Sequence, residues 1–129
     1  LSPLKYAEML RDRVHKHGSK VYLINTGWSG GPYGVGERIK LKYTRRMVSA
    51  ALSGELNEVE TWKDPIFGLH VPVSIEGVPA DILNPKKTWE DPEAYDKKAL
   101  EIARAFQENF KKKYADVAPE VQAAGPVVD

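Results

Sequence analysis

The sequence predicts a mixed α/β fold with about three helices around a small, incomplete sheet. Three segments combine a helical repeat of apolar residues with start and stop signals. One short apolar run is typical of a buried strand, and a glycine-rich stretch follows it closely. With 129 residues, of which 42% are hydrophobic, the chain has the size and composition of one globular domain.

The first helix is expected over residues 3–17. Ser2 can cap its start, Pro3 fits its first turn, and Gly18 is a typical stop signal. The apolar residues that recur at helical spacing are Tyr6, Met9, Leu10 and Val14. This part of the chain is therefore predicted to be an amphipathic helix.

A strand is expected next, from Val21 to Ile24, because this run is continuous, apolar and largely β-favouring. Such a run suits a strand that is buried on both faces. Between residues 27 and 36, five of ten residues are glycine, which predicts a loop whose backbone can approach a ligand closely.

The order of strand, glycine-rich loop and helix is typical of nucleotide sites in α/β proteins. Two phosphate-binding motifs are nevertheless missing. No Gly-Lys-Ser/Thr ends the loop, and the stretch GVGERI at residues 34–39 lacks the third glycine of a dinucleotide fingerprint. A loop that only turns the chain is the alternative interpretation.

A second helix is expected over residues 42–53, with Gly54 as its stop signal. Residues 69–75 then alternate between apolar and polar, as in a half-buried strand. Pro72 cannot donate a ladder hydrogen bond, so irregular edge β or extended chain is predicted there. A long extended connection should follow, marked by the prolines at positions 79, 85 and 92.

The third helix is expected from Pro92 to Lys113, with Asp91 as its cap and three lysines in its last turn. Its predicted buried stripe consists of Tyr95, Ala99, Ile102, Ala103, Phe106 and Phe110. The domain is assigned to residues 1–115. The C-terminal tail, residues 116–129, is expected to be partly ordered at best.

Charge and composition argue against several function classes. Nineteen Lys and Arg against eighteen Asp and Glu leave +1, so we expect no nucleic-acid or membrane partner. The absence of cysteine excludes a disulfide framework and a cysteine nucleophile. No apolar run approaches the roughly 20 residues that span a bilayer, and a cytoplasmic protein is expected.

The chain begins at Leu1, directly on a helix signal, so we also expect upstream sequence.

No catalytic residue or metal ligand is predicted. His15 and His17 are two apart on a predicted helix and so point to different faces. Asp91 and Glu93 are explained by their positions at a helix start.

Five cations follow the glycine loop within nine residues: Arg38, Lys40, Lys42, Arg45 and Arg46. They could face a phosphate, or stack an arginine on a purine. A solvated helix face, balanced by nearby glutamates, is the alternative.

Several short motifs resemble, in order, the C-terminal region of ATP-dependent phosphoenolpyruvate carboxykinases. They begin with NTGW at residues 25–28 and continue with Gly36-x-Arg38-Ile39 and Thr44-Arg45. Further along come ALSG at 51–54, DPIFG at 64–68, GVP at 77–79, ILNP at 82–85 and Thr88-Trp89. Ordered motifs over so much of the chain are far more specific than a lone glycine motif.

The resemblance implies an enzyme of gluconeogenesis that converts oxaloacetate and ATP into phosphoenolpyruvate, ADP and carbon dioxide, with Mg²⁺ and Mn²⁺ as metal ions. It implies that this chain is the C-terminal part of a mononucleotide-binding domain, with the phosphate loop and the metal ligands in upstream sequence. Arg38, Ile39 and Thr44 match the family residues that bind the adenine nucleotide.

Taken alone, the chain is expected to have no turnover and to expose apolar surface. Self-association or marginal stability should result, because the predicted strand at residues 21–24 lacks neighbours. A stand-alone nucleotide-binding or protein-interaction module without catalysis is the alternative from another class.

Overall fold

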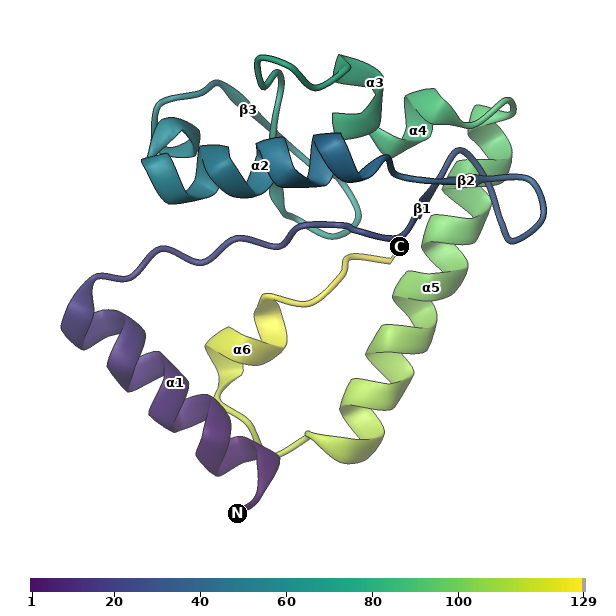
Figure 1. Ribbon diagram of the computed structural model, residues 1–129. Helices are drawn as coiled ribbons and strands as arrows, with labels where there is room; N and C mark the ends of the chain where they lie inside the picture. The colour runs from purple at the N-terminus through teal and green to yellow at the C-terminus, as the bar shows by residue number, and fades with distance from the viewer. Residues whose placement is uncertain (129) are drawn as a thin grey trace.

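The computed structural model describes residues 1–128 and confirms the mixed α/β class (Figure 1). The helices of this part of the chain are α1 (Pro3–His17), α2 (Leu41–Ser53), the 3₁₀ turn η1 (Glu55–Asn57), α3 (Ala80–Leu83), α4 (Pro85–Thr88), α5 (Pro92–Lys113) and α6 (Pro119–Ala123). The strands are β1 (Trp28–Ser29), β2 (Glu37–Arg38), β3 (Thr61–Lys63) and β4 (His70–Pro72). They form two separate two-stranded antiparallel sheets rather than one.

The three long helices lie where their end signals predict them. The hydroxyl of Ser2 accepts a hydrogen bond from the backbone N–H of Lys5 at 3.3 Å, and α1 ends at Gly18 in the left-handed conformation. The carboxylate of Asp91 accepts from two backbone N–H groups in the first turn of α5. Gly54 ends α2 with a φ of 82°. Local capping therefore sets the start of α1 and α5 and the end of α1 and α2, whereas Lys40 at the start of α2 makes no side-chain capping bond.

The predicted strand at Val21–Ile24 is wrong for this structure. Residues 20–26 run as extended chain from α1 to the glycine loop (Figure 1), and Val21 and Leu23 are 70% and 81% exposed. Within the described residues, no backbone group of this segment takes part in a backbone hydrogen bond. A strand needs a neighbouring strand to satisfy its N–H and C=O groups, and residues 1–128 place none beside it.

The predicted extended connection after residue 79 is also wrong, because it contains two single-turn helices. Pro85 stands at the first position of α4, where its missing N–H costs nothing. The hydroxyl of Thr88 donates to the carbonyl of Pro85 at 2.6 Å and closes this turn. The irregular β predicted for residues 69–75 is confirmed, because only His70–Pro72 pairs with β3.

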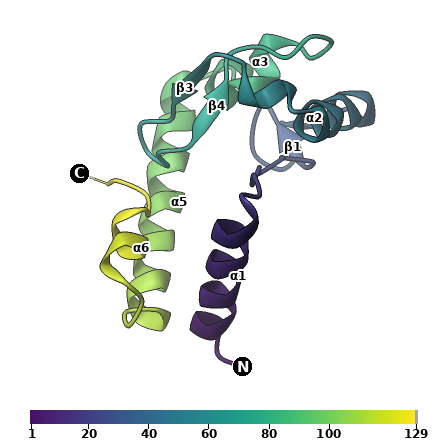
Figure 2. The same cartoon turned by 90° about the vertical axis from the view of Figure 1, so that its left-hand side faces the viewer.

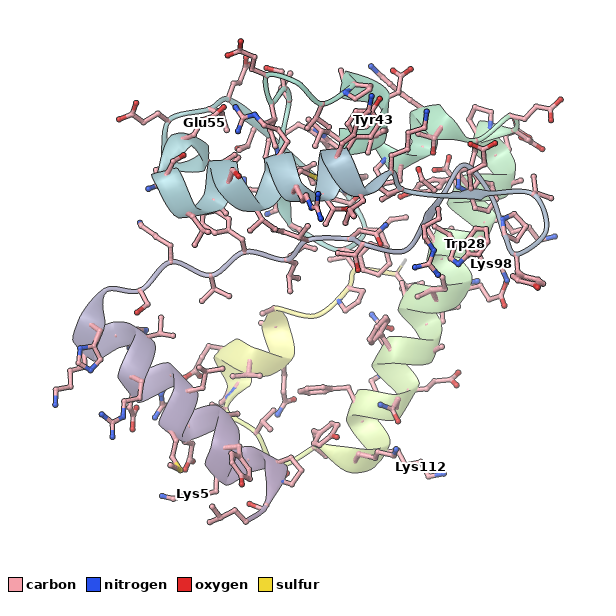
Figure 3. The ribbon with its side chains drawn as sticks, in the orientation of Figure 1. Lys5, Trp28, Tyr43, Glu55, Lys98 and Lys112 are labelled. Carbon is pink, nitrogen blue, oxygen red and sulfur yellow. The ribbon has the colours of Figure 1, made fainter. Side chains whose placement is uncertain are left out.

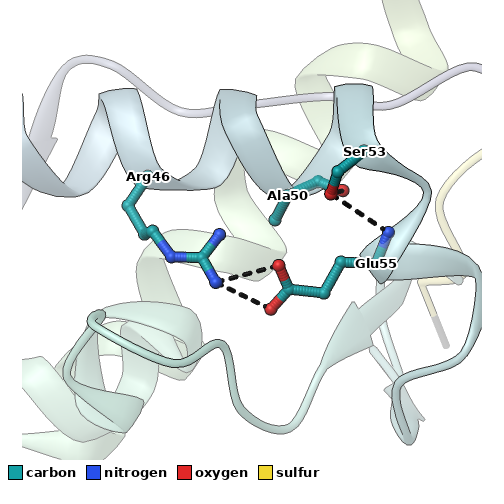
Figure 4. A network of polar contacts seen from close by, with 4 residues as sticks. All are labelled: Arg46, Ala50, Ser53 and Glu55. Atoms are coloured by element: carbon teal, nitrogen blue, oxygen red, sulfur yellow. Dashed lines mark hydrogen bonds and ion pairs between the residues drawn. The ribbon is translucent and has the colours of Figure 1, made fainter.

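The core lies between α2 and the chain from residue 75 to residue 83. Its buried members are Ala50, Ile75, Val78 and Leu83, with Tyr43, Met47, Leu56 and Ile82 packed against them. At one edge, Nη2 of Arg46 donates to both carboxylate oxygens of Glu55 at 2.8 Å (Figure 4). Both side chains are about two-thirds covered, so this ion pair links α2 to η1 beside the core.

The outer helices are less covered than their sequences predict. On α5, Ala99 and Ala103 are buried, but Ile102 and Phe106 are 42% and 58% exposed, which contradicts part of the predicted stripe. No residue of α1 is buried, and this helix lies apart from the layer of α2, α3 and α4 (Figures 1 and 2).

The predicted tail is described up to residue 128, and Asp129 lies outside the described residues. Residues 116–128 form α6 and then return to the main body, where the backbone N–H of Val127 donates to the carbonyl of Ile66 at 2.8 Å. Over residues 1–128, no helix combines the length and the hydropathy that a membrane crossing requires.

Candidate functional site

A cavity of about 460 Å³ opens where the β1–β2 hairpin meets α2, α3 and α4. Its size falls within the range of small-molecule sites. The lining residues come from four neighbouring elements: Ser29, Gly30, Val35, Gly36, Glu37, Arg38, Ile39, Lys40, Tyr43, Pro79, Ile82 and Thr88. The glycine-rich loop singled out in the sequence therefore forms one side of a cavity.

The hairpin that forms this side is tightly closed. Trp28 pairs with Arg38 and Ser29 with Glu37 across the two strands, and the N–H of Ile39 donates to the carbonyl of Gly27 at 2.8 Å. A Cβ on residue 36 would stand 2.5 Å from the carbonyl oxygen of Gly31, so only glycine fits there.

Hydroxyl groups attach the hairpin to α4. The side chain of Ser29 donates to the hydroxyl of Thr88 at 3.2 Å, and Thr88 donates onward to the carbonyl of Pro85. Gly30 has a φ of 89°, and a Cβ there would lie 3.3 Å from the backbone oxygen of Thr88. The backbone of the hairpin at Gly30 therefore lies close to the backbone of α4, and both elements line the cavity.

The cavity combines apolar and cationic sides. Ile39 is only 8% exposed, and Tyr43 and Ile82, which pack against the core, add further apolar surface. Tyr43 extends from α2 toward α3 (Figure 3). Arg38 and Lys40 supply positive charge, and neither has an ion-pair partner among residues 1–128.

Arg38 also contacts the exposed ring of Trp28 on the neighbouring strand. Its guanidinium carbon lies 5.9 Å from the ring centroid, within the range of a cation–π contact. The ring of Tyr33 meets Trp28 edge-on, with 5.9 Å between the centroids. This contact restricts the Arg38 side chain at the rim of the cavity.

Of the three residues predicted to bind nucleotide, Arg38 and Ile39 lie on the cavity lining and Thr44 does not. Thr44 is half-buried in the first turn of α2, where its N–H donates to the carbonyl of Lys40 at 3.3 Å. Tyr43 lines the cavity in its place, because successive helical residues point about 100° apart.

Sequence reasoning missed Ser29, Tyr43, Ile82 and Thr88 as site residues. Ile82 and Thr88 do stand in the motifs ILNP and Thr88-Trp89, so a signal for them was present. The five cations after the loop do not form one charged patch at the cavity. Arg38 and Lys40 line it, whereas Arg46 is paired with Glu55 beside the core. Within residues 1–128, no group of three or more His, Cys, Asp or Glu side chains is placed to hold a metal ion.

The sequence is similar to a family of known enzymes. The sequence model of the phosphoenolpyruvate carboxykinase family matches residues 1–81. A protein of Caldanaerobacter subterraneus named phosphoenolpyruvate carboxykinase (ATP) is 58% identical over 126 residues, which is 98% of this chain and 24% of that protein. Phosphoenolpyruvate carboxykinase (ATP) 2 of Moorella thermoacetica and phosphoenolpyruvate carboxykinase (ATP) of Thermus thermophilus are 56% and 53% identical, again over 98% of this chain and 24% of their own length.

Proposed function

The chain belongs to the ATP-dependent phosphoenolpyruvate carboxykinase family, and from this premise we propose that it supplies the adenine-nucleotide side of that enzyme's active site. The complete reaction would convert oxaloacetate and ATP into phosphoenolpyruvate, ADP and carbon dioxide, a lyase step of gluconeogenesis in the cytoplasm. The observation that carries the proposal is the position of Arg38 and Ile39. These two residues of the family motif lie together on the lining of one cavity.

The chemistry of the lining suits an adenine nucleotide. Ile39 and Ile82 offer apolar surface against which a flat base can pack. The guanidinium of Arg38 can stack on the base or face a phosphate, because it is planar and permanently charged. Lys40 adds a second cation at the same opening. In this proposal Thr44 supports the base from the first turn of α2.

The metal ions of the reaction, Mg²⁺ and Mn²⁺, would be held by residues outside this chain. The described residues offer no cluster of ligands for them. In this proposal the chain contributes binding and orientation of the nucleotide. Phosphoryl transfer depends on positioning by metal ions and a phosphate loop, so we expect the 129-residue chain alone to have no turnover. A coupled assay for ADP formation checks this expectation.

Nucleotide binding is best tested in a carboxykinase chimera. In this chimera the present chain replaces the matched 24% of the Caldanaerobacter relative. Arg38→Ala should weaken ATP binding by about 1.5–3 kcal/mol if the guanidinium bonds a phosphate. Thr44→Ala should weaken it less, because Thr44 does not line the cavity. Oxaloacetate binding should not change. Arg13→Ala, on exposed α1, is the matched control.

Titration calorimetry with ATP, adenosine and oxaloacetate separates the alternatives. A loss for ATP but not for adenosine would assign Arg38 to the phosphates, and an equal loss for both would assign it to the base. Unchanged ATP affinity in Arg38→Ala would contradict the proposed site.

A further inference from the structure

Two exposed aromatic rings of the hairpin form a chain of contacts that ends at Arg38. The ring of Trp28, on β1 (Figure 3), is 47% exposed, and that of Tyr33, in the loop, is 91% exposed. Trp28 pairs with Arg38 across the two strands, so their side chains leave the same face of the hairpin. Tyr33 meets the other ring edge-on, which gives the order Tyr33, Trp28, Arg38.

The loop between the strands holds Tyr33 near Trp28. The backbone N–H groups of Val35 and Gly36 both donate to the carbonyl of Pro32, at 3.0 and 2.9 Å, and these bonds close a turn around Tyr33. The position of this exposed ring is therefore set by a closed backbone turn and not by burial.

The ring of Trp28 orders the Arg38 side chain before any ligand binds. Arg38 has no ion-pair partner among residues 1–128, and its guanidinium lies against the ring instead. An arginine that samples many rotamers loses this freedom when it binds a ligand, and the loss lowers affinity. A ring that already holds the guanidinium removes part of that cost.

We propose that Trp28 is a positioning residue for the adenine nucleotide, which holds Arg38 in its binding orientation, and that Tyr33 in turn holds Trp28. The inference rests on the proposed function of the cavity and extends it to two residues outside the cavity lining. Because Trp28 does not line the cavity, its effect passes through Arg38. The competing role for Trp28 is direct stacking on the nucleotide base.

The contact itself is measured by NMR of the 129-residue chain. The ring current of Trp28 should shift the side-chain resonances of Arg38, and Trp28→Leu should remove this shift. The side chain of Arg13, on exposed α1, is the reference. Arg38 resonances that match those of Arg13 in the unmodified chain would overturn the inference.

A double-mutant cycle in the carboxykinase chimera tests the route through Arg38. Trp28→Leu should weaken ATP binding about two- to fivefold, the size expected for one exposed cation–π contact. Trp28→Phe keeps an aromatic face and should retain most of the affinity. In the Arg38→Ala background, Trp28→Leu should have no further effect. Titration calorimetry with ATP and oxaloacetate measures each protein, and oxaloacetate affinity should stay unchanged.

The outcomes of the cycle separate this inference from the proposed function. Weakened ATP binding in Arg38→Ala with unchanged binding in Trp28→Leu would overturn the inference alone. Unchanged binding in Arg38→Ala would contradict both. An equal loss from Trp28→Leu in the two backgrounds would overturn the route through Arg38 in favour of direct stacking.

Tyr33→Leu gives the same test at a position that folding does not depend on. If Trp28→Leu does not fold, Tyr33→Leu replaces it in the cycle, because its ring is 91% exposed. It should weaken ATP binding about twofold, and only while Arg38 is present. Tyr6→Leu, at a 60% exposed ring on α1, is the matched control and should leave ATP affinity unchanged. Equal ATP affinities for Tyr33→Leu and Tyr6→Leu would contradict the role of Tyr33.

Discussion

Two regions of the molecule contrast in how their residues are covered. Among residues 1–128, the region from Ile39 to Leu83 contains every buried side chain outside α5, whereas residues 1–26 contain none. Both regions have well-defined helices of similar length, α2 and α1. The contrast indicates that a helix can be specified by local capping and periodicity, whereas burial of its apolar face depends on contacts with other elements.

The largest expected difference between the regions is in core substitutions. Leu83→Ala removes a side chain that is only 8% exposed and should lower the free energy of unfolding by about 2–5 kcal/mol. Leu10→Ala on α1 should change it by about 0.5 kcal/mol or less, because Leu10 is 65% exposed. Urea unfolding of the 129-residue chain measures both. Similar losses would show that α1 is packed in solution.

A glycine substitution in each region sharpens the comparison. Gly36→Ala places a Cβ against backbone oxygens of Gly31 and Ser29 and should cost about 1–3 kcal/mol. Gly18→Ala meets no atom within 4 Å, so its only cost is the left-handed backbone, about 1 kcal/mol, and fraying of α1 can relieve it. Thermal unfolding should therefore separate the two variants. A larger effect at Gly18 would contradict the tight hairpin.

Ion pairs should show a smaller difference. Glu55→Gln disrupts the two bonds from Arg46 beside the core and should cost about 1 kcal/mol or less, since the pair is partly exposed. Asp12→Asn breaks the exposed pair with Arg11 on α1 and should have no measurable effect. A double-mutant cycle with Arg46→Met isolates the coupling. No coupling would mean that solvent screens this pair as completely as a surface pair.

The smallest expected effect is pH-dependent. Burial, and then the charges of Asp64 and Asp96, raise the pKa of Tyr95 above its ordinary value of 10.0. Because the unfolded tyrosine ionises first, its contribution to stability is present below pH 10 and is lost as pH rises through the higher folded pKa. Tyr95→Phe should therefore lose less stability than the unmodified chain above pH 10. Tyr6→Phe, at a 60% exposed position, is the control, and identical pH profiles for all three proteins would contradict the prediction.

The elements that the sequence predicted correctly are those with local causes. Ser2, Gly18, Gly54 and Asp91 set helix ends through hydrogen bonds or backbone conformations within a few residues. The errors have distant causes. The run at residues 21–24 has strand character, but nothing in residues 1–128 pairs with it. Phe106 belongs to the predicted apolar stripe of α5, but no other element covers it, and its side chain is exposed.

The sequence predicted only part of the candidate site, again because some of its contacts join residues that are far apart in the chain. Arg38 and Ile39 were found through a family motif that is continuous in sequence. The contact between Ser29 and Thr88 joins residues 59 positions apart, and neither residue type signals a partner at that distance. Such a contact follows from the packing of α4 against the hairpin, which no local pattern encodes.

The compact placement of the core along the chain has a consequence for the order of folding. All members of the cluster and its packed neighbours lie between Tyr43 and Leu83. The contacts between α2 and residues 75–83 close loops of about 25–40 residues, and the entropy of closing a loop grows only slowly with its length. We therefore expect this stretch to collapse first, and α5 with its returning tail to add to a nucleus that already exists.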